Sequence, residues 1–314
     1  MQAYLFQRIL LAFPVLIGVA AVTFLLIRIV PGTAVDVQLG ASRDPADREK
    51  LERQLGLDKS IPEQFLIWVK GVVTGDLGES FMKRQAVGDV LKQRFPVTLE
   101  MAMIATAVAL VLAIPFGVVS AIRQDSPLDH AVRLVSILGL AIPGFWLATL
   151  IITLPAIWWH TTVPLTFTPF LRDPIGNLHQ MIFPALTLGV AQSAILMRLT
   201  RSSMLEVLRQ DYVRTAWSKG LRERVVVFRH ALKNALIPVV TVWGLQFSAL
   251  LGGTVIQERI FNFPGLGQAV IESITARDYP VIQAVVLLFA LVYVLMNLLV
   301  DLTYSVLDPR IRYG

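Results

Sequence analysis

The chain contains no cysteine among its 314 residues, so it can form neither a disulfide bond nor a thiolate metal site. Charged residues are also scarce, at 16% of the total. The phosphate-binding motif Gly-x-x-x-x-Gly-Lys-Ser/Thr does not occur, which excludes ATP binding by a P-loop. These absences argue against a thiol-dependent enzyme and against a nucleotide-hydrolysing one.

Histidine is nearly as rare as cysteine. The four histidines, His130, His160, His179 and His230, are scattered, and none has a second histidine or a glutamate at metal-binding spacing. Gly265-Leu-Gly267 lacks the third glycine of a dinucleotide-binding turn and follows no predicted strand. The sequence therefore predicts no catalytic residue, no metal site and no cofactor within this chain.

Apolar residues, in contrast, are abundant and are gathered into long runs. They make up 55% of the chain, and the mean hydropathy is +0.65. A helix needs about 20 apolar residues to cross the hydrocarbon of a bilayer. Six segments meet or approach this length, which predicts an all-α polytopic membrane protein with six transmembrane helices. The segments are Ile9–Val30, Val97–Ile122, Leu134–Trp159, Met181–Met197, Ile237–Gln257 and Val281–Val300.

Positive charge is concentrated between the fourth and fifth segments. Residues 198–233 carry nine Lys and Arg against three Asp and Glu, so their net charge of +6 equals that of the whole chain. Short cytoplasmic loops are enriched in Lys and Arg. We therefore expect both termini and the loops 123–133 and 198–236 to be cytoplasmic. The segments 31–96, 160–180 and 258–280 are then exterior.

The exterior segment 31–96 has ten basic and ten acidic residues and helical patterns of its own. Asp47–Leu57 predicts a short charged helix. Ile61–Gly71 has the amphipathic spacing of a helix at the membrane interface, with Phe65 and Trp68 as anchors. The segment suits a scaffolding loop, and a contact surface for an external partner is the alternative.

Ionisable residues occur only near the ends of the predicted spans, where a long side chain can reach the interface. A proton- or sodium-driven carrier would need such groups deep in the membrane. Uncharged polar residues do occur inside the spans, and they either line a wet path or join helices by hydrogen bonds. The candidates for the path are Gln192, Ser193, Gln246 and Ser248.

Helix-breaking and small residues also occur inside the spans. Pro115 interrupts the second segment, Pro143 and Pro155 interrupt the third, and Pro184 lies in the fourth, which is the shortest. Gly252-Gly253 would allow a close helix contact in the fifth segment. These features suit a bundle that rocks between two states, although static membrane proteins contain them as well.

The basic region has the pattern of an ordered docking element. Ser202–Gln210 can extend the fourth helix, Asp211 is a suitable N-cap for a second short helix, and Gly220 can end it with a positive φ. Five apolar or aromatic residues in this stretch predict a partner surface, with partial burial against the chain's own helices as the alternative. They are Tyr212, Val213, Ala216, Trp217 and Leu221.

This stretch, Asp211-Tyr-Val-Arg-Thr-Ala-Trp-Ser-Lys-Gly-Leu221, resembles the coupling loop of ABC-importer permeases of the dipeptide/oligopeptide/nickel class. Ala216 and Gly220 match the general pattern Glu-Ala-Ala-x-x-x-Gly, whereas Arg214 and Thr215 replace its first two residues. Further stretches of the chain resemble stretches of these permeases, and they occur in the order found in that class. They are Gly75–Ser80, Pro96–Glu100, Arg229–Pro238, Glu258–Gly267, Ala276–Gln283 and Leu307–Arg312.

The resemblance implies a type I ABC-importer permease fold in a bacterial or archaeal cytoplasmic membrane. Residues 1–96 would hold the first transmembrane helix and a long exterior loop, and 97–314 a five-helix permease core with the coupling loop at about 198–236. The coupling residues it implies are Asp211, Tyr212, Thr215, Ala216, Lys219, Gly220 and Leu221.

The resemblance also implies partners and a mechanism. A second homologous permease chain, two P-loop ATPase subunits that bind ATP and Mg²⁺, and an exterior substrate-binding protein would join this chain among membrane lipids, without nucleic acid. The implied activity is alternating-access import of di- or oligopeptides. A nickel chelate or another small solute as substrate, a secondary transporter and a channel-like subunit are the alternatives.

Overall fold

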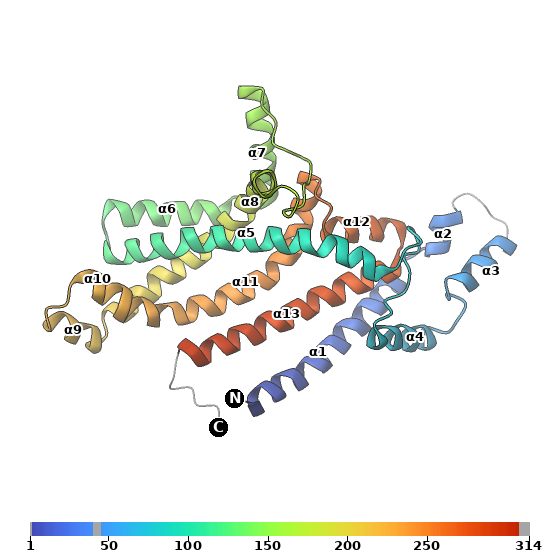
Figure 1. Ribbon diagram of the computed structural model, residues 1–314, viewed down its shortest axis with the longest axis horizontal. Coiled ribbons are helices and arrows are strands. Elements are labelled where there is room, and N and C mark those ends of the chain that lie inside the picture. Colours follow the sequence, from blue (N-terminus) through green and yellow to red (C-terminus); the bar gives the residue numbers. More distant parts are fainter. Residues whose placement is uncertain (1, 40–44, 308–314) are drawn as a thin grey trace. The chain divides into compact units, whose positions relative to one another are not determined.

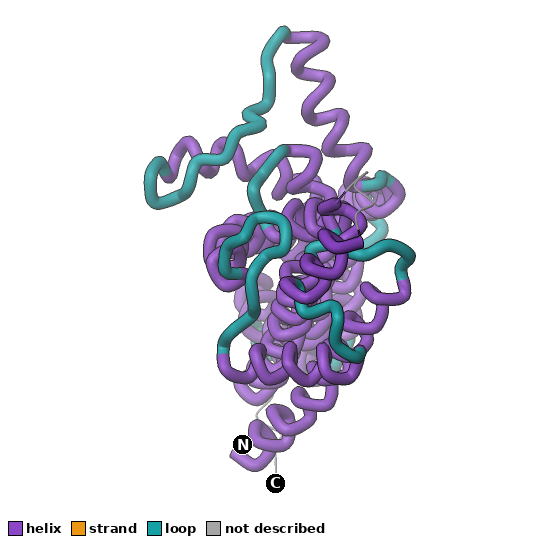
Figure 2. Tube along the Cα trace, turned by 90° about the vertical axis from the view of Figure 1, so that its right-hand side faces the viewer, coloured by secondary structure: helices purple, strands orange, loops and turns teal. Residues whose placement is uncertain are grey.

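The computed structural model describes residues 2–39 and 45–307. These residues form helices joined by loops and no extended strand, as Figures 1 and 2 show. The all-α prediction is therefore confirmed. The helices are α1 Gln2–Ile29, α2 Ala34–Leu39, α3 Pro45–Gln54, α4 Ile61–Thr74, α5 Val87–Ile122, α6 Pro127–Ala141, α7 Gly144–Trp159, α8 Pro174–Leu208, α9 Asp211–Ser218, α10 Glu223–Val225, the π-helix η1 Val226–Ala231, α11 Leu232–Phe261, α12 Leu266–Ala276 and α13 Tyr279–Leu307. Within the Leu307–Arg312 stretch, residues 308–312 lie outside the described part.

Five helical segments are long and apolar enough to cross a membrane. They are Phe6–Ile29, Val87–Ile122, Pro174–Leu208, Glu223–Phe261 and Tyr279–Thr303. The third predicted span, Leu134–Trp159, is not one helix, because α6 and α7 meet there at a bend of 96°. The count of six is reached when this bent pair is taken as a single span.

Proline chemistry explains the bend. Pro143 has no backbone N–H to donate and disfavours helical geometry at the residue before it. Ile142 accordingly is extended, with φ −83° and ψ 118°. Pro115, Pro155 and Pro184 do not have this effect, since all three lie inside continuous helices. Of the prolines considered in the sequence, Pro143 alone ends its helix.

By packing, the described residues fall into two compact units. One contains 99–263 and the residues from 295 onward, and the other contains 2–98 and 264–294. Residues 264–294 thus pack with the N-terminal part of the chain. The functional division at residue 96 is not tested by this grouping and stays a prediction.

In the first unit, α8 packs against α6, α7 and α11. It also lies close to α5, because a Cβ atom added to Gly189 would stand only 2.7 Å from the carbonyl oxygen of Ala105. Small residues at helix contacts let backbones approach in membrane proteins. The expected close helix contact at Gly252-Gly253 is not found, since a Cβ atom added to Gly252 would meet nothing within 4 Å and one added to Gly253 would meet only the side chain of Leu188, at 3.6 Å.

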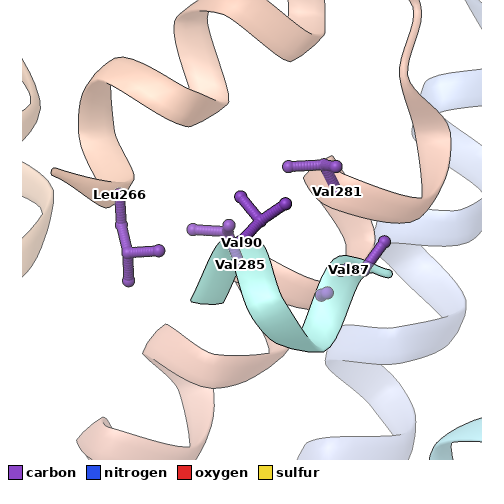
Figure 3. Close-up of a cluster of buried hydrophobic side chains, with 6 residues drawn as sticks. Val87, Val90, Leu266, Val281 and Val285 are labelled. Atoms are coloured by element: carbon purple, nitrogen blue, oxygen red, sulfur yellow. The ribbon is translucent and has the colours of Figure 1, made fainter. Parts of the chain in front are cut away.

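In the second unit, a cluster of buried aliphatic residues joins three helices (Figure 3). The start of α5 contributes Val87 and Val90, α12 contributes Leu266, and α13 contributes Val281 and Val285. All five side chains are at most 3% exposed. The cluster holds the first turns of these helices together.

A polar network in the same unit fixes residues 75–86, which we call the 75–86 connection. The buried carboxylate of Asp278 accepts hydrogen bonds from the Ser80 hydroxyl and from the backbone N–H groups of Phe81 and Met82. Lys83 pairs with Glu272 at 3.4 Å. The connection is therefore held through charged and polar groups.

The predicted helices of segment 31–96 are present as α3 and α4. Helix α4 starts with a capping box, in which the Glu63 carboxylate accepts hydrogen bonds from the backbone N–H and the hydroxyl of Ser60. Those bonds lower the pKa of Glu63, the side-chain bond most. Phe65 and Trp68 both contact the ring of Phe24 in α1, so these predicted anchors pack on the chain itself.

Candidate functional site

The coupling segment, defined here as residues 209–231, comprises α9, α10 and the π-helix η1. It follows directly on α8, which extends to Leu208 as the sequence predicted for Ser202–Gln210. Gln210 is the N-cap of α9, and no side chain caps it. The prediction of Asp211 as N-cap is therefore wrong, because Asp211 is already the first helical residue.

Asp211 nevertheless suits its position, since a negative charge in the first turn of a helix interacts favourably with the helix dipole. Its side chain is 98% exposed and lies 3.7 Å from the guanidinium of Arg214. An exposed pair at this distance contributes little to stability. The Asp211 carboxylate is thus available to a partner.

The end of α9 matches the prediction. Lys219 is the C-cap, and Gly220 follows with φ +72°. The Gly220 N–H donates to the carbonyl oxygen of Trp217 at 2.9 Å. Glycine adopts this left-handed conformation without the steric cost that a Cβ atom brings. Gly220 therefore sets the turn that returns the chain towards α10.

Two residues of α9 that the sequence predicted to lie on a partner surface are buried instead. Val213 and Ala216 are 0% and 5% exposed, and they pack with Val226 of η1. Partly buried Val207, Leu208 and Leu221 complete the cluster. The two residues are three apart and so share one face of the helix. Helix α9 is thereby fixed to the chain's own helix ends.

Tyr212 adds a polar tether to this packing. Its hydroxyl accepts a hydrogen bond from the side-chain amide of Asn234 in α11 at 2.7 Å and lies 3.4 Å from the carbonyl oxygen of His230. Tyr212 as a whole remains 43% exposed, and Trp217 is 44% exposed. Tyr212 therefore links α9 to the start of α11 and still offers part of its ring to a partner.

The outer face of α9 is polar and uncommitted to the chain's own core. Thr215 is exposed, and its hydroxyl only donates back to the carbonyl oxygen of Asp211 at 2.9 Å. Lys219 is exposed as well, and Phe228 of η1 is 57% exposed. Exposed aromatic side chains such as that of Phe228 are enriched at protein interfaces.

Sequence reasoning missed one anchor beside this segment. Arg201 of α8 forms a bidentate ion pair with Asp129 of α6, with both N–O distances at 2.7 Å. Asp129 is fully buried and also accepts hydrogen bonds from the Ser120 hydroxyl and the Asp125 N–H. The Ser126-Pro-Leu-Asp129 pattern signals a helix start, but no spacing signals a partner 72 residues away.

The structure brings together two of the four path candidates. The side-chain amide of Gln192 in α8 donates to the carbonyl oxygen of Gln246 in α11 at 3.1 Å. Ser193 and Ser248 instead donate to carbonyl oxygens of their own helices, Val190 and Gly244. The two serines are therefore satisfied locally, whereas the two glutamines join helices.

Several buried polar atoms near this helix pair have no hydrogen-bond partner among the described residues. They include the Oε1 atom of Gln192, both side-chain amide atoms of Gln246 and the indole N–H of Trp243. An unpaired buried polar atom costs about 1–3 kcal/mol. The α8–α11 contact thus carries hydrogen-bonding capacity that the chain itself does not use.

No metal centre emerges from the described residues, in which no three His, Asp or Glu side chains form a group able to hold an ion. The ordered features are instead a rigid polar-faced helix at the end of α8 and a pair of glutamines between two spans. Neither arrangement places a nucleophile beside a base.

Two family models match the chain. The model described as binding-protein-dependent transport system inner membrane component matches residues 113–313, and its N-terminal companion matches residues 1–102. Among solved structures, an inward-facing methionine ABC transporter has a TM-score of 0.54 at 18% identity, covering 70% of this chain and 96% of that one. This likeness supports a type I ABC-importer permease fold.

Curated relatives match over the full length. The oligopeptide transport system permease protein AppB of Bacillus subtilis is 39% identical, with 100% of both chains covered. The di/tripeptide permease DppB of Pseudomonas aeruginosa and the glutathione permease GsiC of Pectobacterium atrosepticum are each 40% identical, covering 100% of this chain and at least 99% of the relative. The chain therefore belongs to the family of binding-protein-dependent transport system inner membrane components, the permease subunits of ABC importers.

Proposed function

We propose that this permease forms half of a translocation pathway that imports di- or oligopeptides by alternating access. The names of the oligopeptide and di/tripeptide permeases among its relatives support this substrate class. A second homologous permease chain would complete the pathway. An exterior binding protein would deliver the peptide to it.

Energy would come from two P-loop ATPase subunits that bind ATP and Mg²⁺ and hydrolyse the nucleotide. The permease itself supplies no catalytic site and no cofactor in this proposal. It lies in the cytoplasmic membrane with both termini and the coupling segment on the ATPase side. The six-span topology and the +6 net charge of residues 198–233 support that orientation.

The observation that carries the proposal is the packing of α9. Val213 and Ala216 fix the helix to η1 and α8, while Asp211 and Thr215 face outwards. Moving an equilibrium from 1:99 to 99:1 takes about 5.5 kcal/mol of differential binding. Because α9 is rigidly attached, its movement with a closing ATPase pair can be passed to α8 and α11, and the binding free energy of closure can drive their rearrangement.

The glutamines between α8 and α11 fit a peptide. A peptide backbone presents one N–H donor and one C=O acceptor per residue. The side-chain amide of Gln246 offers one donor group and one acceptor, and both are buried without a partner in the described residues. Gln192 bonds the backbone of Gln246, so the two residues would act together along the path.

The coupling role is tested by Thr215→Arg in the complete reconstituted assembly. The added arginine projects from the outer face of α9 and would block an ATPase groove without disturbing Val213 or Ala216. We expect loss of ATPase co-purification and at least tenfold slower ATP-driven uptake. Co-purification and uptake equal to wild type would disprove the assignment.

Thr275→Arg provides the matched control. Thr275 is also an exposed helical threonine, and its hydroxyl donates to the carbonyl oxygen four residues earlier, at 3.1 Å. This variant should retain the ATPase subunits.

The substrate class is tested separately by competing labelled dipeptide uptake with longer peptides and with nickel chelates. Competition by the nickel chelate alone would contradict a peptide substrate.

A further inference from the structure

An apolar groove of about 460 Å³ runs beside α1, within the second unit. Phe13 and Ile17 of α1, Val72 of α4 and Leu288 of α13 are among its lining residues. Helices α1 and α13 are both long and apolar enough to cross a membrane. The groove therefore lies where lipid acyl chains are the surrounding solvent.

A polar pocket of about 360 Å³ adjoins the groove at the end of α1. Trp68 and Leu77 line both cavities, so the two lie next to each other. The pocket is lined by residues of α1, α4, the 75–86 connection and the start of α13. A molecule that fills both cavities needs one polar end and one apolar end.

Two of the residues that line the pocket carry a hydrogen-bond donor without a partner. The indole N–H of Trp68 and the side-chain NH₂ of Gln283 are both buried without an acceptor among the described residues. Gln283 is only 3% exposed, and it lines the pocket. A buried donor without an acceptor is costly, and an anionic oxygen is the acceptor that satisfies it best.

The charges around the pocket favour an anion. Arg28, Lys59 and Arg84 line it, against Asp76 and Glu79. The Arg28 guanidinium is held in place by two bonds to the side-chain oxygen of Gln64 and lies 3.5 Å from the centre of the Phe24 ring. A guanidinium fixed in this way is well suited to bind phosphate.

We propose that the polar pocket and the apolar groove together bind one glycerophospholipid of the bilayer. Its phosphate lies against Trp68, Gln283 and Arg28, and one acyl chain occupies the groove. Apolar contacts alone cannot select such a lipid, since bilayer tails are as apolar as the groove. The buried donors must therefore supply the selectivity.

Native mass spectrometry of the complete assembly during stepwise delipidation tests the proposal. Trp68→Phe and Gln283→Leu each remove one donor and keep a side chain of similar size. Wild type should retain one phospholipid per chain under conditions in which the double variant shows at least tenfold lower occupancy. Trp158→Phe, at a 65% exposed position on α7, should behave like wild type.

Equal phospholipid occupancy in the double variant and wild type would overturn the proposal, as would a wild type that retains none. Co-elution of each variant with its ATPase subunits confirms that it folds.

A second permease chain is the other conceivable occupant of the groove. Because the chain has no cysteine, Val73→Cys on the 80% exposed rim of the groove can carry a single benzophenone. A photoadduct with a phospholipid supports the site, and an adduct with another permease chain contradicts it.

Discussion

The coupling segment and the 75–86 connection are both short stretches that lead into long helices, but the main contacts that hold them in place differ. Helix α9 is fixed by the apolar side chains of Val213 and Ala216, while its charged residues point outwards. The 75–86 connection is fixed by Asp278, whose carboxylate accepts three hydrogen bonds inside the unit. Apolar anchoring leaves charges free for a partner, whereas polar anchoring uses them internally.

Of the variants that test this difference, Ala216→Arg should have the largest effect on uptake. A long charged side chain cannot fit against Val226, and overpacking of this kind costs about 3 kcal/mol. We expect α9 to detach and ATP-driven uptake to be largely lost, while membrane insertion is retained. Arg214→Gln, which removes a charge whose side chain is 72% exposed, is the control and should keep near-normal uptake. Equal loss in both variants would mean that charge, not packing, anchors the segment.

Asp278→Ala should be the strongest perturbation of the other region. It leaves the Ser80 hydroxyl and the N–H groups of Phe81 and Met82 without an acceptor, at a cost of about 2 kcal/mol. Thermal unfolding and proteolysis of residues 75–86 should both report the change. Asp89→Asn, at an exposed position of α5, should leave both measurements unaltered.

Gly220→Ala should have a smaller effect on the coupling segment. A residue with a Cβ atom at φ +72° is strained by about 1–2 kcal/mol. We expect a reduced ATPase activity response to substrate, with the assembly still intact. Gly252→Ala serves as the control, because its Cβ atom meets nothing within 4 Å. A Gly220→Ala protein that couples normally would show that the left-handed turn is dispensable.

The smallest effect concerns pH and the start of α4. The hydrogen bonds from Ser60 lower the pKa of Glu63, so the carboxylate stabilises the folded helix at neutral pH. That contribution should disappear as the pH falls through the lowered pKa. The protection factors for hydrogen exchange in the first turn of α4 should fall more steeply with acid in wild type than in Ser60→Ala. Identical acid profiles would rule out the capping box as the cause.

The sequence predicted features that depend on local residues. The apolar runs gave the spans, and the glycine at position 220 gave the end of α9. Proline at 143 indicated an interruption, but the bend of 96° depends on how α6 and α7 pack on α8. Local patterns therefore indicated which segments are helical more reliably than where each helix begins or how it turns.

Contacts between distant residues could not be predicted. The sequence around Val213 and Ala216 does not indicate that they are buried, because their burial depends on Val226, which the π-helix η1 places beside them. The pairing of Arg201 with Asp129 joins residues 72 positions apart, and that of Gln192 with Gln246 joins residues 54 apart. Each depends on the placement of α8, which no single stretch of sequence encodes.

The length of α8 has a consequence for the assembly as a whole. Its apolar run ends at Met197, and the helix continues from Arg198 to Leu208, which adds about 16 Å at 1.5 Å per residue. In a bilayer whose hydrocarbon ends near Met197, this extension would place α9 beyond the lipid headgroups. A partner that docks there can remain an ordinary water-soluble protein, with no need for a membrane-binding surface of its own.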